Sequence, residues 1–517
     1  MTDLGSIKTV RFDGAPLTAT EVEALARREA LAVLSGEIEF RQRIDAGAAF
    51  LEQVWREDGV IYGVTTGYGD SCSVNVPQEL VHSLPRHLYT FHGCGMGAPF
   101  SLEETRAILA ARLASLCQGY SGVRYVLLER ICLLLQRDLL PVIPSEGSVG
   151  ASGDLTPLSY LAAVIEGHRE LWYKGERRAA AEVFELEGLE PLVLQPKEAL
   201  ALMNGTAAMT GLACLAVCRA RYLAQLAARI TSLCSVALEG NHFHFDPVLF
   251  SVKPHPGQQA VAGWIHDDLK EEEVPRNSSR LQDRYSLRCA PHVIGVLQDS
   301  LGYVTDFVEN ELNSANDNPI IDAEGAHILH GGHFYGGHIA HAMDGLKSAV
   351  ANLADLVDRQ IAQAVDPKFN HGLPANLSGA TGAAASVNHG FKAVQIAVSA
   401  WTAEALKGTM PASVFSRSTE CHNQDKVSMG TIAARDCQRV LELVEQVLAA
   451  GMLVGWQGVQ LRLRDSELAE RDLRPSLRKC LEQTGMRFEF LQEDRPLEAD
   501  LHRAVACIHE RYWTLYD

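Results

Sequence analysis

The sequence predicts a mainly α protein, a bundle of long helices with a loop-rich N-terminal region. Apolar residues recur at helical spacing over long stretches, whereas alternating strand patterns are few and short. Long helices of this kind pack into bundles. Loops rich in Gly, Pro, Asn and His separate them, at residues 61–76, 92–100, 144–154, 240–258, 312–342 and 366–390. Because long loops in a large helical protein are often functional, we expect the active site among them.

The first helices are predicted from caps and apolar stripes. Thr18 and Glu21 stand at capping-box spacing, which indicates a helix start. Residues 101–118 carry a helical apolar stripe that stops at Gly119. Residues 206–238 form the most apolar stretch, and because arginines interrupt it we expect a buried helix and no membrane span.

Two more long helices are predicted in the second half of the chain. Residues 343–366 are predicted to be helical up to Pro367, and residues 433–452 repeat the apolar spacing. One face of the first should carry Leu346, Val350, Leu353, Val357, Ile361 and Ala364. We expect one continuous globular unit with three regions: an N-terminal region (1–205), a central long-helix bundle (206–455) and a C-terminal helical region (456–517).

Charge and cysteine content exclude several classes of partner. The net charge of −18 argues against nucleic acid and anionic membranes as partners. The 12 cysteines are scattered without a CxxC pair, and the N-terminus has no apolar signal core. We therefore expect a cytoplasmic protein with reduced thiols.

The most informative segment is GSVGASGDLTPLSY at residues 147–160. At its centre, the small residues Ala151-Ser152-Gly153 permit a very tight backbone fold, in which a glycine amide can approach a carbonyl two residues back. The simplest alternative is a small-residue turn before a helix, with Thr156 as N-cap, Pro157 in the first turn and a stop at Gly167. A phosphate-binding loop is not supported, because GxxxxGK[ST] is absent.

The whole fourteen-residue run resembles the signature of the aromatic amino acid lyase family, and the resemblance extends from about residue 10 to beyond 450. This family comprises histidine, phenylalanine and tyrosine ammonia-lyases and related aminomutases. The resemblance implies a helical bundle of the ammonia-lyase/fumarase-like type. It implies that Ala151-Ser152-Gly153 condenses autocatalytically to a methylidene-imidazolone group, an electrophile that needs no external cofactor. It also implies a homotetramer with active sites shared between subunits.

Further motifs supply the catalytic residues that the resemblance implies. Tyr62, in the glycine-rich segment YGVTTGYG (62–69), corresponds to the catalytic tyrosine of a mobile inner loop. Gln282, Tyr285 and Arg288 are spaced three apart, a spacing that allows them to share one helical face; the alternative is a polar surface stripe. Arg288 would bind the substrate carboxylate, and Tyr285 would handle protons at the amine. Asn204 would help to hold the imidazolone and the carboxylate.

A second group of residues is expected to bind the substrate. In the family, the pair at Phe91-His92 contacts the ring, and His92 offers a hydrogen bond to a phenol or an imidazole. Gln424 stands where histidine lyases carry a glutamate, which weakens the histidine interpretation. Glu420 and Lys392 match positions of phenylalanine lyases, in which the glutamate lies near the substrate amine.

The segment HGGHFYGG (330–337) supplies an aromatic residue, Phe334, which corresponds to a ring packed near the electrophile. The family usually has Asn-Phe-His here, so the roles of His333 and Tyr335 stay open. A metal site is the alternative for the histidines at 327, 330, 333, 338 and 341. HExxH is absent and no acidic residue stands at ligand spacing, so we expect no metal.

The predicted function is elimination of ammonia from L-tyrosine or L-phenylalanine, giving an aryl acrylate such as p-coumarate. Tyr62 would remove the β-proton while Arg288 fixes the carboxylate. Tyrosine is preferred because His92 offers the phenol a polar partner. Three alternatives stay open: histidine ammonia-lyase, an aromatic amino acid 2,3-aminomutase on the same site, and a catalytically inert homologue.

Overall fold

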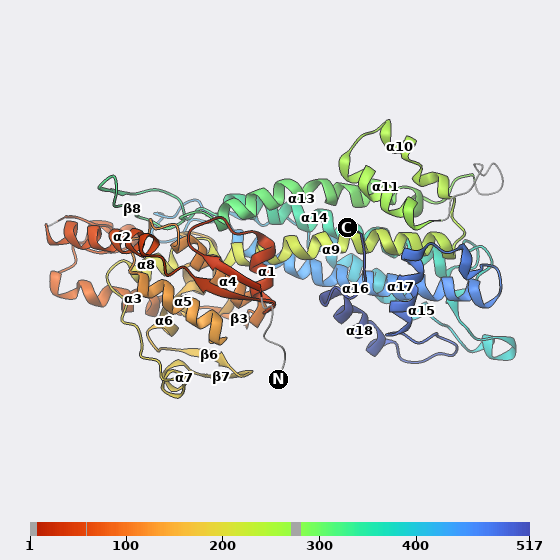
Figure 1. The fold of residues 1–517 in the computed structure, drawn as a ribbon, viewed down its shortest axis with the longest axis horizontal. Coiled ribbons are helices and arrows are strands. Elements are labelled where there is room, and N and C mark those ends of the chain that lie inside the picture. The colour runs from red at the N-terminus through yellow and green to blue at the C-terminus, as the bar shows by residue number, and fades with distance from the viewer. Residues whose placement is uncertain (1–7, 58, 270–280, 517) are drawn as a thin grey trace. The chain divides into compact units, whose positions relative to one another are not determined.

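The structure is a computed structural model that describes residues 8–57, 59–269 and 281–516. In this part of the chain the fold is mainly α, with long helices and short strands, which confirms the predicted fold class (Figure 1). The chain forms two compact units, each assembled from segments that are far apart in sequence. Unit 1 comprises Met1–Cys218, Val304–Asp344 and Pro411–Arg435, and unit 2 comprises Arg219–Tyr303, Gly345–Met410 and Asp436–Asp517.

Unit 1 contains short helices and all the named strands of the described residues. Its helices are α1 (Ala19–Ala26), α2 (Ile38–Arg56), η1 (Gly69–Ser73), η2 (Gln78–Ser83), α3 (Leu84–Phe91), α4 (Leu102–Leu116), α5 (Tyr125–Arg137), α6 (Leu155–Ile165), α7 (Ala180–Glu187), α8 (Glu198–Met203) and η6 (Ser413–Phe415). Its strands are β1 (Lys8–Phe12), β2 (Ala30–Leu34), β3 (Met96–Pro99), β4 (Leu140–Pro141), β5 (Pro144–Glu146), β6 (Glu170–Tyr173), β7 (Glu176–Ala179), β8 (Ile320–Asp322) and β9 (His327–Leu329). They form four small sheets, of which β1-β2 is parallel and β3-β5, β4-β6-β7 and β8-β9 are antiparallel.

Four long helices contribute to both units, and the remaining elements belong to unit 2. The long helices are α9 (Ala207–Ala237), α13 (Ala290–Leu312), α14 (Gly337–Val365) and α16 (Gly430–Arg464). The others are η3 (His242–Phe245), α10 (Pro247–Ser251), α11 (Pro256–Asp268), α12 (Tyr285–Arg288), η4 (Ala375–Leu377), η5 (Gly382–Ser386), α15 (Lys392–Lys407), η7 (Glu470–Asp472), α17 (Pro475–Gly485) and α18 (Glu498–His509).

The helix-start signals of unit 1 are confirmed at α1 and corrected at α6. Thr18 accepts a hydrogen bond from the Glu21 amide at 3.2 Å, and the reciprocal bond completes the capping box. Helix α6 begins at Leu155 with Asp154 as its N-cap, so the prediction of Thr156 as N-cap is wrong. The Asp154 side chain makes no cap bond, because other partners described below occupy it.

In unit 2, segments of α9, α14 and α16 pack closely around an apolar core. A Cβ on Gly451 of α16 would lie 2.6 Å from Val357 of α14 and 3.1 Å from Ile230 of α9, so glycine permits this approach. The predicted apolar face of α14 is buried. The helix itself starts at Gly337, earlier than predicted, and α16 extends the predicted 433–452 helix in both directions.

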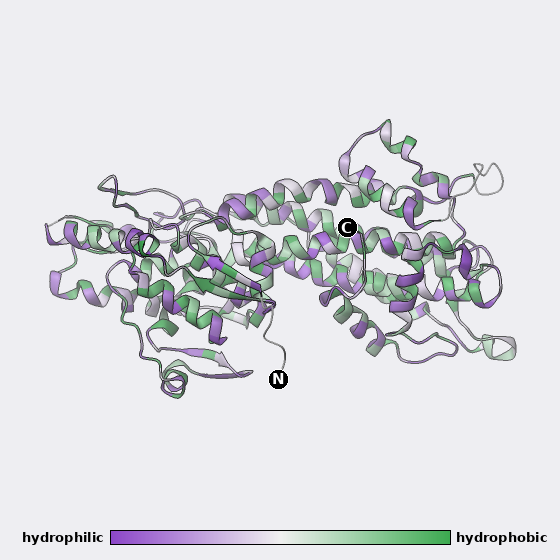
Figure 2. Ribbon diagram, viewed as in Figure 1, coloured by the Kyte–Doolittle hydropathy of each residue, from purple (hydrophilic) through white to green (hydrophobic). Residues whose placement is uncertain are grey.

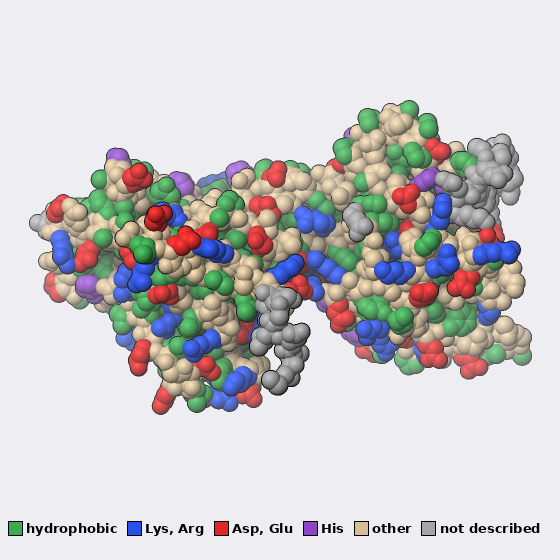
Figure 3. Space-filling view, viewed as in Figure 1, with side chains coloured by type: hydrophobic (Ala, Val, Ile, Leu, Met, Phe, Trp, Pro, Cys, Tyr) green, Lys and Arg blue, Asp and Glu red, His purple; other side chains and the backbone are tan. Residues whose placement is uncertain are grey.

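Helices α9 and α16 are long and apolar enough to cross a membrane, but 83% and 89% of their apolar windows are buried in the protein. Figure 2 shows the apolar residues distributed along these helices. Burial within the protein is what a core helix requires, as predicted for residues 206–238. Acidic and basic side chains are intermixed on the face seen in Figure 3, which shows no extended basic patch.

Three helices of unit 1 place the functional segments. Helices α3, α6 and α8 contact one another in pairs. His92 follows the last residue of α3, Asn204 follows the last residue of α8, and Ala151-Ser152-Gly153 lies just before α6. Their packing therefore brings together three segments that are separated by up to about a hundred residues of sequence.

Candidate active site

A cavity of about 710 Å³ lies beside Ser152, and all of its lining residues belong to unit 1. Of the residues predicted from sequence, it is lined by Tyr62, Phe91, His92, Ala151, Ser152, Asn204, Phe334, Glu420 and Gln424. Gly153 is buried next to it. The remaining predicted residues, Gln282, Tyr285, Arg288 and Lys392, belong to unit 2 and do not line this cavity.

The carbonyl oxygen of Ser152 accepts two hydrogen bonds. Asn204 donates from Nδ2 at 2.6 Å, and the amide of Gly205 donates at 3.3 Å. The Asn204 side chain is oriented by its other end, because Oδ1 accepts the Asn318 amide at 2.7 Å. This pair of donors is suited to stabilising negative charge that develops on the Ser152 oxygen.

Gly153 has no room for a side chain. Its φ is +74°, and a Cβ would lie 2.1 Å from the carbonyl oxygen of Gly205. The two glycines form an isolated bridge, and the Asp154 amide donates to the Gly205 carbonyl at 2.7 Å. The backbone after Ser152 is therefore held in a conformation that only glycine adopts at this spacing.

The Asp154 carboxylate is buried where three helices begin. It accepts bonds from the Met209 amide in the first turn of α9 at 2.9 Å, from Ser148 at 3.1 Å and from Thr431 at the start of α16. Burial raises the pKa of this carboxyl, and these donors oppose the shift. Asp154, the residue before α6, thus links the segment of Ser152 to the first turns of α9 and α16.

A tight turn at residues 419–424, which precede α16 in the chain, contacts Ser152. Gln424 donates from Nε2 to the Ser152 hydroxyl at 3.1 Å and accepts from Thr419 at 2.9 Å. Residues 420–422 all have left-handed φ values of 51–64°. The turn places Glu420 and Gln424 on the same cavity, although only Gln424 bonds to Ser152.

Tyr62 lies in the inner loop (residues 61–76), with its ring edge-on to Tyr68 and His330. Its hydroxyl accepts the Gly69 amide at 2.7 Å. Burial is the main cause that raises the Tyr62 pKa; the Gly69 amide lowers it, and the Glu420 charge raises it further. Action as a base therefore requires a cationic group or a further donor to approach the phenol.

Phe91 and His92, the pair predicted to contact the substrate ring, differ in polarity. Phe91 is 59% exposed in the single chain, and its ring centroid lies 4.3 Å from that of His92. His92 Nδ1 is 2.9 Å from the Leu88 carbonyl, which can only accept, so Nδ1 carries the proton. Burial lowers the His92 pKa, and a neutral ring with this tautomer leaves Nε2 as an acceptor.

In unit 2, the residues Gln282, Tyr285 and Arg288 lie close to one another, but only Tyr285 and Arg288 are in a helix. Helix α12 covers Tyr285–Arg288, so the prediction that Gln282 shares its face is wrong. The residues meet nonetheless: Arg288 donates to Gln282 at 3.2 Å and lies over the Tyr285 ring at 4.7 Å. Tyr285 is 71% exposed, and Lys392 begins α15 with an exposed side chain.

The cavity also contains residues that sequence reasoning missed. They are Tyr68, Gly69, Ser71, Cys72, Leu88, Leu155, Leu200, Asn318, His330, Asn423, Asp425 and Lys426. The histidine-rich segment is the sequence signal for His330, although its pattern suggests a metal site and not a cavity lining. Its other members go elsewhere: His338 and His341 contact Phe307, and His327 lies 3.5 Å from Asp322.

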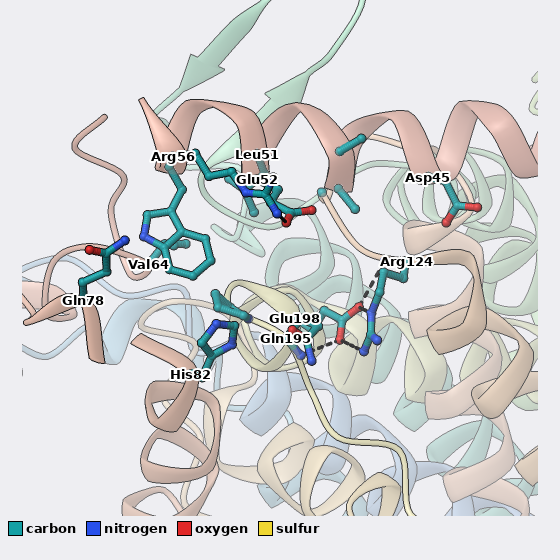
Figure 4. Close-up of a pocket in the computed structure, with 15 residues that line it drawn as sticks. Asp45, Leu51, Glu52, Arg56, Val64, Gln78, His82, Arg124, Gln195 and Glu198 are labelled. Atoms are coloured by element: carbon teal, nitrogen blue, oxygen red, sulfur yellow. Dashed lines mark hydrogen bonds and ion pairs between the residues drawn. The ribbon is translucent and has the colours of Figure 1, made fainter. Parts of the chain in front are cut away.

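A second cavity of about 550 Å³ lies against α2 and the start of α8 (Figure 4). Its Glu198 is paired with Arg124 at 2.7 Å and also accepts the Gln195 amide at 2.7 Å. None of the predicted site residues lines it. Because Glu198 is the first residue of α8, these bonds anchor the helix that leads to Asn204.

The chain matches a known protein family over most of its length. Residues 17–483 match the aromatic amino acid lyase family. The chain is 38% identical over 457 residues to histidine ammonia-lyase of Myxococcus xanthus, which covers 88% of this chain and 89% of that relative.

The chain also resembles solved structures of a tyrosine aminomutase and a histidine ammonia-lyase. Tyrosine aminomutase from Streptomyces globisporus aligns with a TM-score of 0.90 at 33% identity, covering 98% of this chain and 97% of that one. Histidine ammonia-lyase from Trypanosoma cruzi aligns with a TM-score of 0.88 at 31% identity, covering 98% and 94%. The chain therefore belongs to the aromatic amino acid lyase family and is a carbon–nitrogen lyase.

Proposed function

We propose that this chain eliminates ammonia from an aromatic L-amino acid to give an aryl acrylate. The observation that carries the proposal is the environment of Ser152. Two donors converge on its carbonyl oxygen, and Gly153 sits where no Cβ fits. The residues present thus suit a methylidene-imidazolone formed from Ala151-Ser152-Gly153, which would supply a carbon electrophile for the substrate amine.

The chain's own residues then have distinct tasks. Asn204 and the Gly205 amide would stabilise negative charge on the Ser152 oxygen. Tyr62 would take the β-proton of the substrate, once a cationic group or a further hydrogen-bond donor near the phenol offsets the rise in its pKa. Glu420, which lines the cavity, would accept hydrogen bonds from the substrate ammonium.

L-Histidine is the substrate that the relatives favour, since the curated relatives at 34–38% identity are histidine ammonia-lyases. This supports the alternative prediction better than the tyrosine that was preferred from the sequence. His92 is compatible with either ring, because its Nε2 acceptor can pair with an imidazole N–H or a phenol O–H. It disfavours phenylalanine, whose ring would leave that acceptor unpaired.

L-Tyrosine is the second candidate, and Gln424 is the observation that favours it. A histidine ring would gain from a carboxylate at this position, whereas Gln424 is neutral and already bonded to Ser152 and Thr419. An aromatic 2,3-aminomutase would use the same residues and differ in how long ammonia is retained.

We further propose a homotetramer in which Tyr285, Arg288 and Gln282 of one subunit complete the site of another. These residues belong to unit 2 and do not line the cavity in unit 1 of the same chain, and Tyr285 is largely exposed. No disulfide joins the described cysteines, which supports the cytoplasm as the compartment.

A substrate panel tests the function. The purified chain is incubated separately with L-histidine, L-tyrosine and L-phenylalanine, and the absorbance of urocanate, p-coumarate and cinnamate is followed. Chromatography detects any β-amino acid. One acrylate should accumulate with the wild type and none with Ser152→Ala. A β-amino acid without acrylate would favour the aminomutase, and no product from any of the three would contradict the proposal.

A further inference from the structure

The tip of the inner loop is bonded to the rest of unit 1 through Glu420. The loop tip (residues 69–75) contains η1, and its residues 70–75 are exposed. Within the described residues, the hydrogen bonds that leave the loop tip go either to residues 62–68 or to Glu420. Both oxygens of the Glu420 carboxylate accept the Asp70 amide, at 2.9 and 3.0 Å.

The backbone of the loop tip is shaped to receive this carboxylate. Gly69 has a φ of +57°, and a Cβ on it would lie 2.4 Å from each Glu420 oxygen. Glycine therefore allows the carboxylate to reach the Asp70 amide. The same residue donates its own amide to the Tyr62 hydroxyl at 2.7 Å, so the tether at Asp70 and the phenol are adjacent along the backbone.

Glu420 still has acceptor capacity that faces the cavity. Its bonded donors are the Asp70 amide and Asn423 Nδ2 at 3.1 Å, which are both neutral. Among the described residues it forms no ion pair with a lysine, arginine or histidine. A carboxylate has about four lone-pair positions, so a cationic donor can bind it without displacing the loop tip.

From this geometry we infer that Glu420 is a latch, through which the ammonium group of the substrate holds the inner loop closed. The inference rests on the proposed function for the identity of the ligand, an aromatic L-amino acid. Binding of the ammonium fixes the carboxylate, and the fixed carboxylate retains the Asp70 amide. Loss of the amino group from the substrate removes this support, so the loop tip is released after elimination.

The latch gives Glu420 a positioning role beyond contact with the amine. The loop tip forms one wall of the cavity through Gly69, Ser71 and Cys72. While it is held, it shields the reacting atoms from water and keeps Gly69 on the Tyr62 hydroxyl. The lifetime of the latch would then set how long ammonia stays beside the acrylate, which is the difference between a lyase and an aminomutase.

Amide hydrogen exchange of the peptide that covers residues 69–73 tests the latch without any turnover. In the absence of ligand, Glu420→Ala should speed exchange about tenfold or more, as expected for loss of a bond to a charged group. Gly69→Ala should do the same from the loop side. Glu420→Gln retains an acceptor and should stay near the wild type, and Asp425→Asn, a cavity residue with no bond to the loop tip, is the matched control. Unchanged exchange in both Glu420→Ala and Gly69→Ala would overturn the latch.

The role of the ammonium is tested in Ser152→Ala, which we expect to bind the amino acid without converting it. L-Histidine, L-tyrosine and L-phenylalanine are compared with urocanate, p-coumarate and cinnamate, which lack the amino group. The amino acid should slow exchange of the loop tip severalfold, the matching acrylate should not, and adding Glu420→Gln should abolish the difference. Equal protection by both, or by neither, would overturn the ammonium coupling. Absence of turnover by the wild type with an intact latch would instead count against the proposed function alone.

Discussion

At the scale of single residues, chemistry at this site depends on polar atoms whose orientation is fixed by a second partner. Asn204 directs Nδ2 to Ser152 because the Asn318 amide occupies Oδ1. Gln424 is held in the same manner by Thr419. Asn204 and Gln424 were predicted from their motifs, but Asn318 was not. A backbone amide leaves no sequence signal, since every residue except proline carries one.

Asn204→Asp isolates the donor on the Ser152 oxygen. Aspartate can still accept the Asn318 amide but, when ionised, cannot donate to Ser152. We expect kcat to fall by about 10²–10³, as for loss of one oxyanion-hole donor. Steady-state kinetics with the preferred amino acid measures this, with peptide mass as the check that the Ser152 segment is modified as in the wild type. Full kcat in Asn204→Asp would contradict the role of this donor.

The Tyr62 base should respond to the charge of Glu420. Burial is the main cause that raises the Tyr62 pKa, and the Glu420 charge adds to the rise. The phenol must lose its proton to act, so kcat/KM should climb with pH as Tyr62 ionises. Glu420→Gln removes a negative charge, which lowers the Tyr62 pKa and should move this rise to lower pH. The pH profiles are compared with the same substrate, so that titration of its amine cancels. A shift to higher pH would be inconsistent with Tyr62 as the base.

At the scale of helices and loops, apolar patterning predicted the central parts of α9, α14 and α16, because apolar stripes report burial directly. The fourth long helix, α13, was not predicted. The buried face of α14 is the clearest case. Local signals failed where tertiary contacts compete with them. Thr156 looks like an N-cap, yet α6 begins at Leu155, because the buried Asp154 bonds to α9 and α16. The spacing of Gln282 suggested a helix that in fact starts at Tyr285.

The pairing of α9 with α16 in unit 2 has a measurable pH signature. Glu445 is buried, which alone would raise its pKa, but Arg219 at 2.9 Å and His509 lower the pKa to about 2 from an ordinary 4.5. A lowered folded-state pKa stabilises the fold above about pH 4.5, and this stability is lost as pH falls toward 2.

Glu445→Gln should therefore lower the thermal midpoint at neutral pH, since breaking a buried pair costs roughly 3–5 kcal/mol. It should also flatten the fall of the midpoint between pH 4.5 and 2. The matched control is Glu442→Gln, which breaks an exposed pair with Arg439 on the same helix and should change little. Equal effects of the two variants by scanning calorimetry would refute this account of Glu445.

At the scale of the whole molecule, the sequence predicted the family and the residues around Ser152, because each lies in a motif with its own spacing. The ring preference could not be predicted in the same way. Gln424 favours tyrosine and His92 suits either ring, whereas similarity over most of the chain favours histidine. The residues of unit 2 were predicted as members of one site, but they do not line the cavity of unit 1. No local sequence pattern indicates which residues from distant segments line one cavity.

Shared active sites can be tested by complementation. Ser152→Ala and Arg288→Ala should each be nearly inactive as pure proteins. If Arg288 acts on another subunit's Ser152, mixed oligomers assembled from both variants should regain part of the wild-type activity. Co-expression with two different affinity tags isolates the mixed species for assay. Activity that stays at the level of the single variants would argue that each site uses residues of its own chain.

Peptide mass spectrometry at residues 151–153 tests the central claim most directly. Ring closure between Gly153 nitrogen and the Ala151 carbonyl releases one water, and conversion of Ser152 to the methylidene releases a second. The wild-type peptide should therefore be lighter by two waters than its sequence mass, while the Ser152→Ala peptide should not lose the serine-derived water. An unmodified mass at Ala151-Ser152-Gly153 in a protein that turns over substrate at full rate would contradict the account.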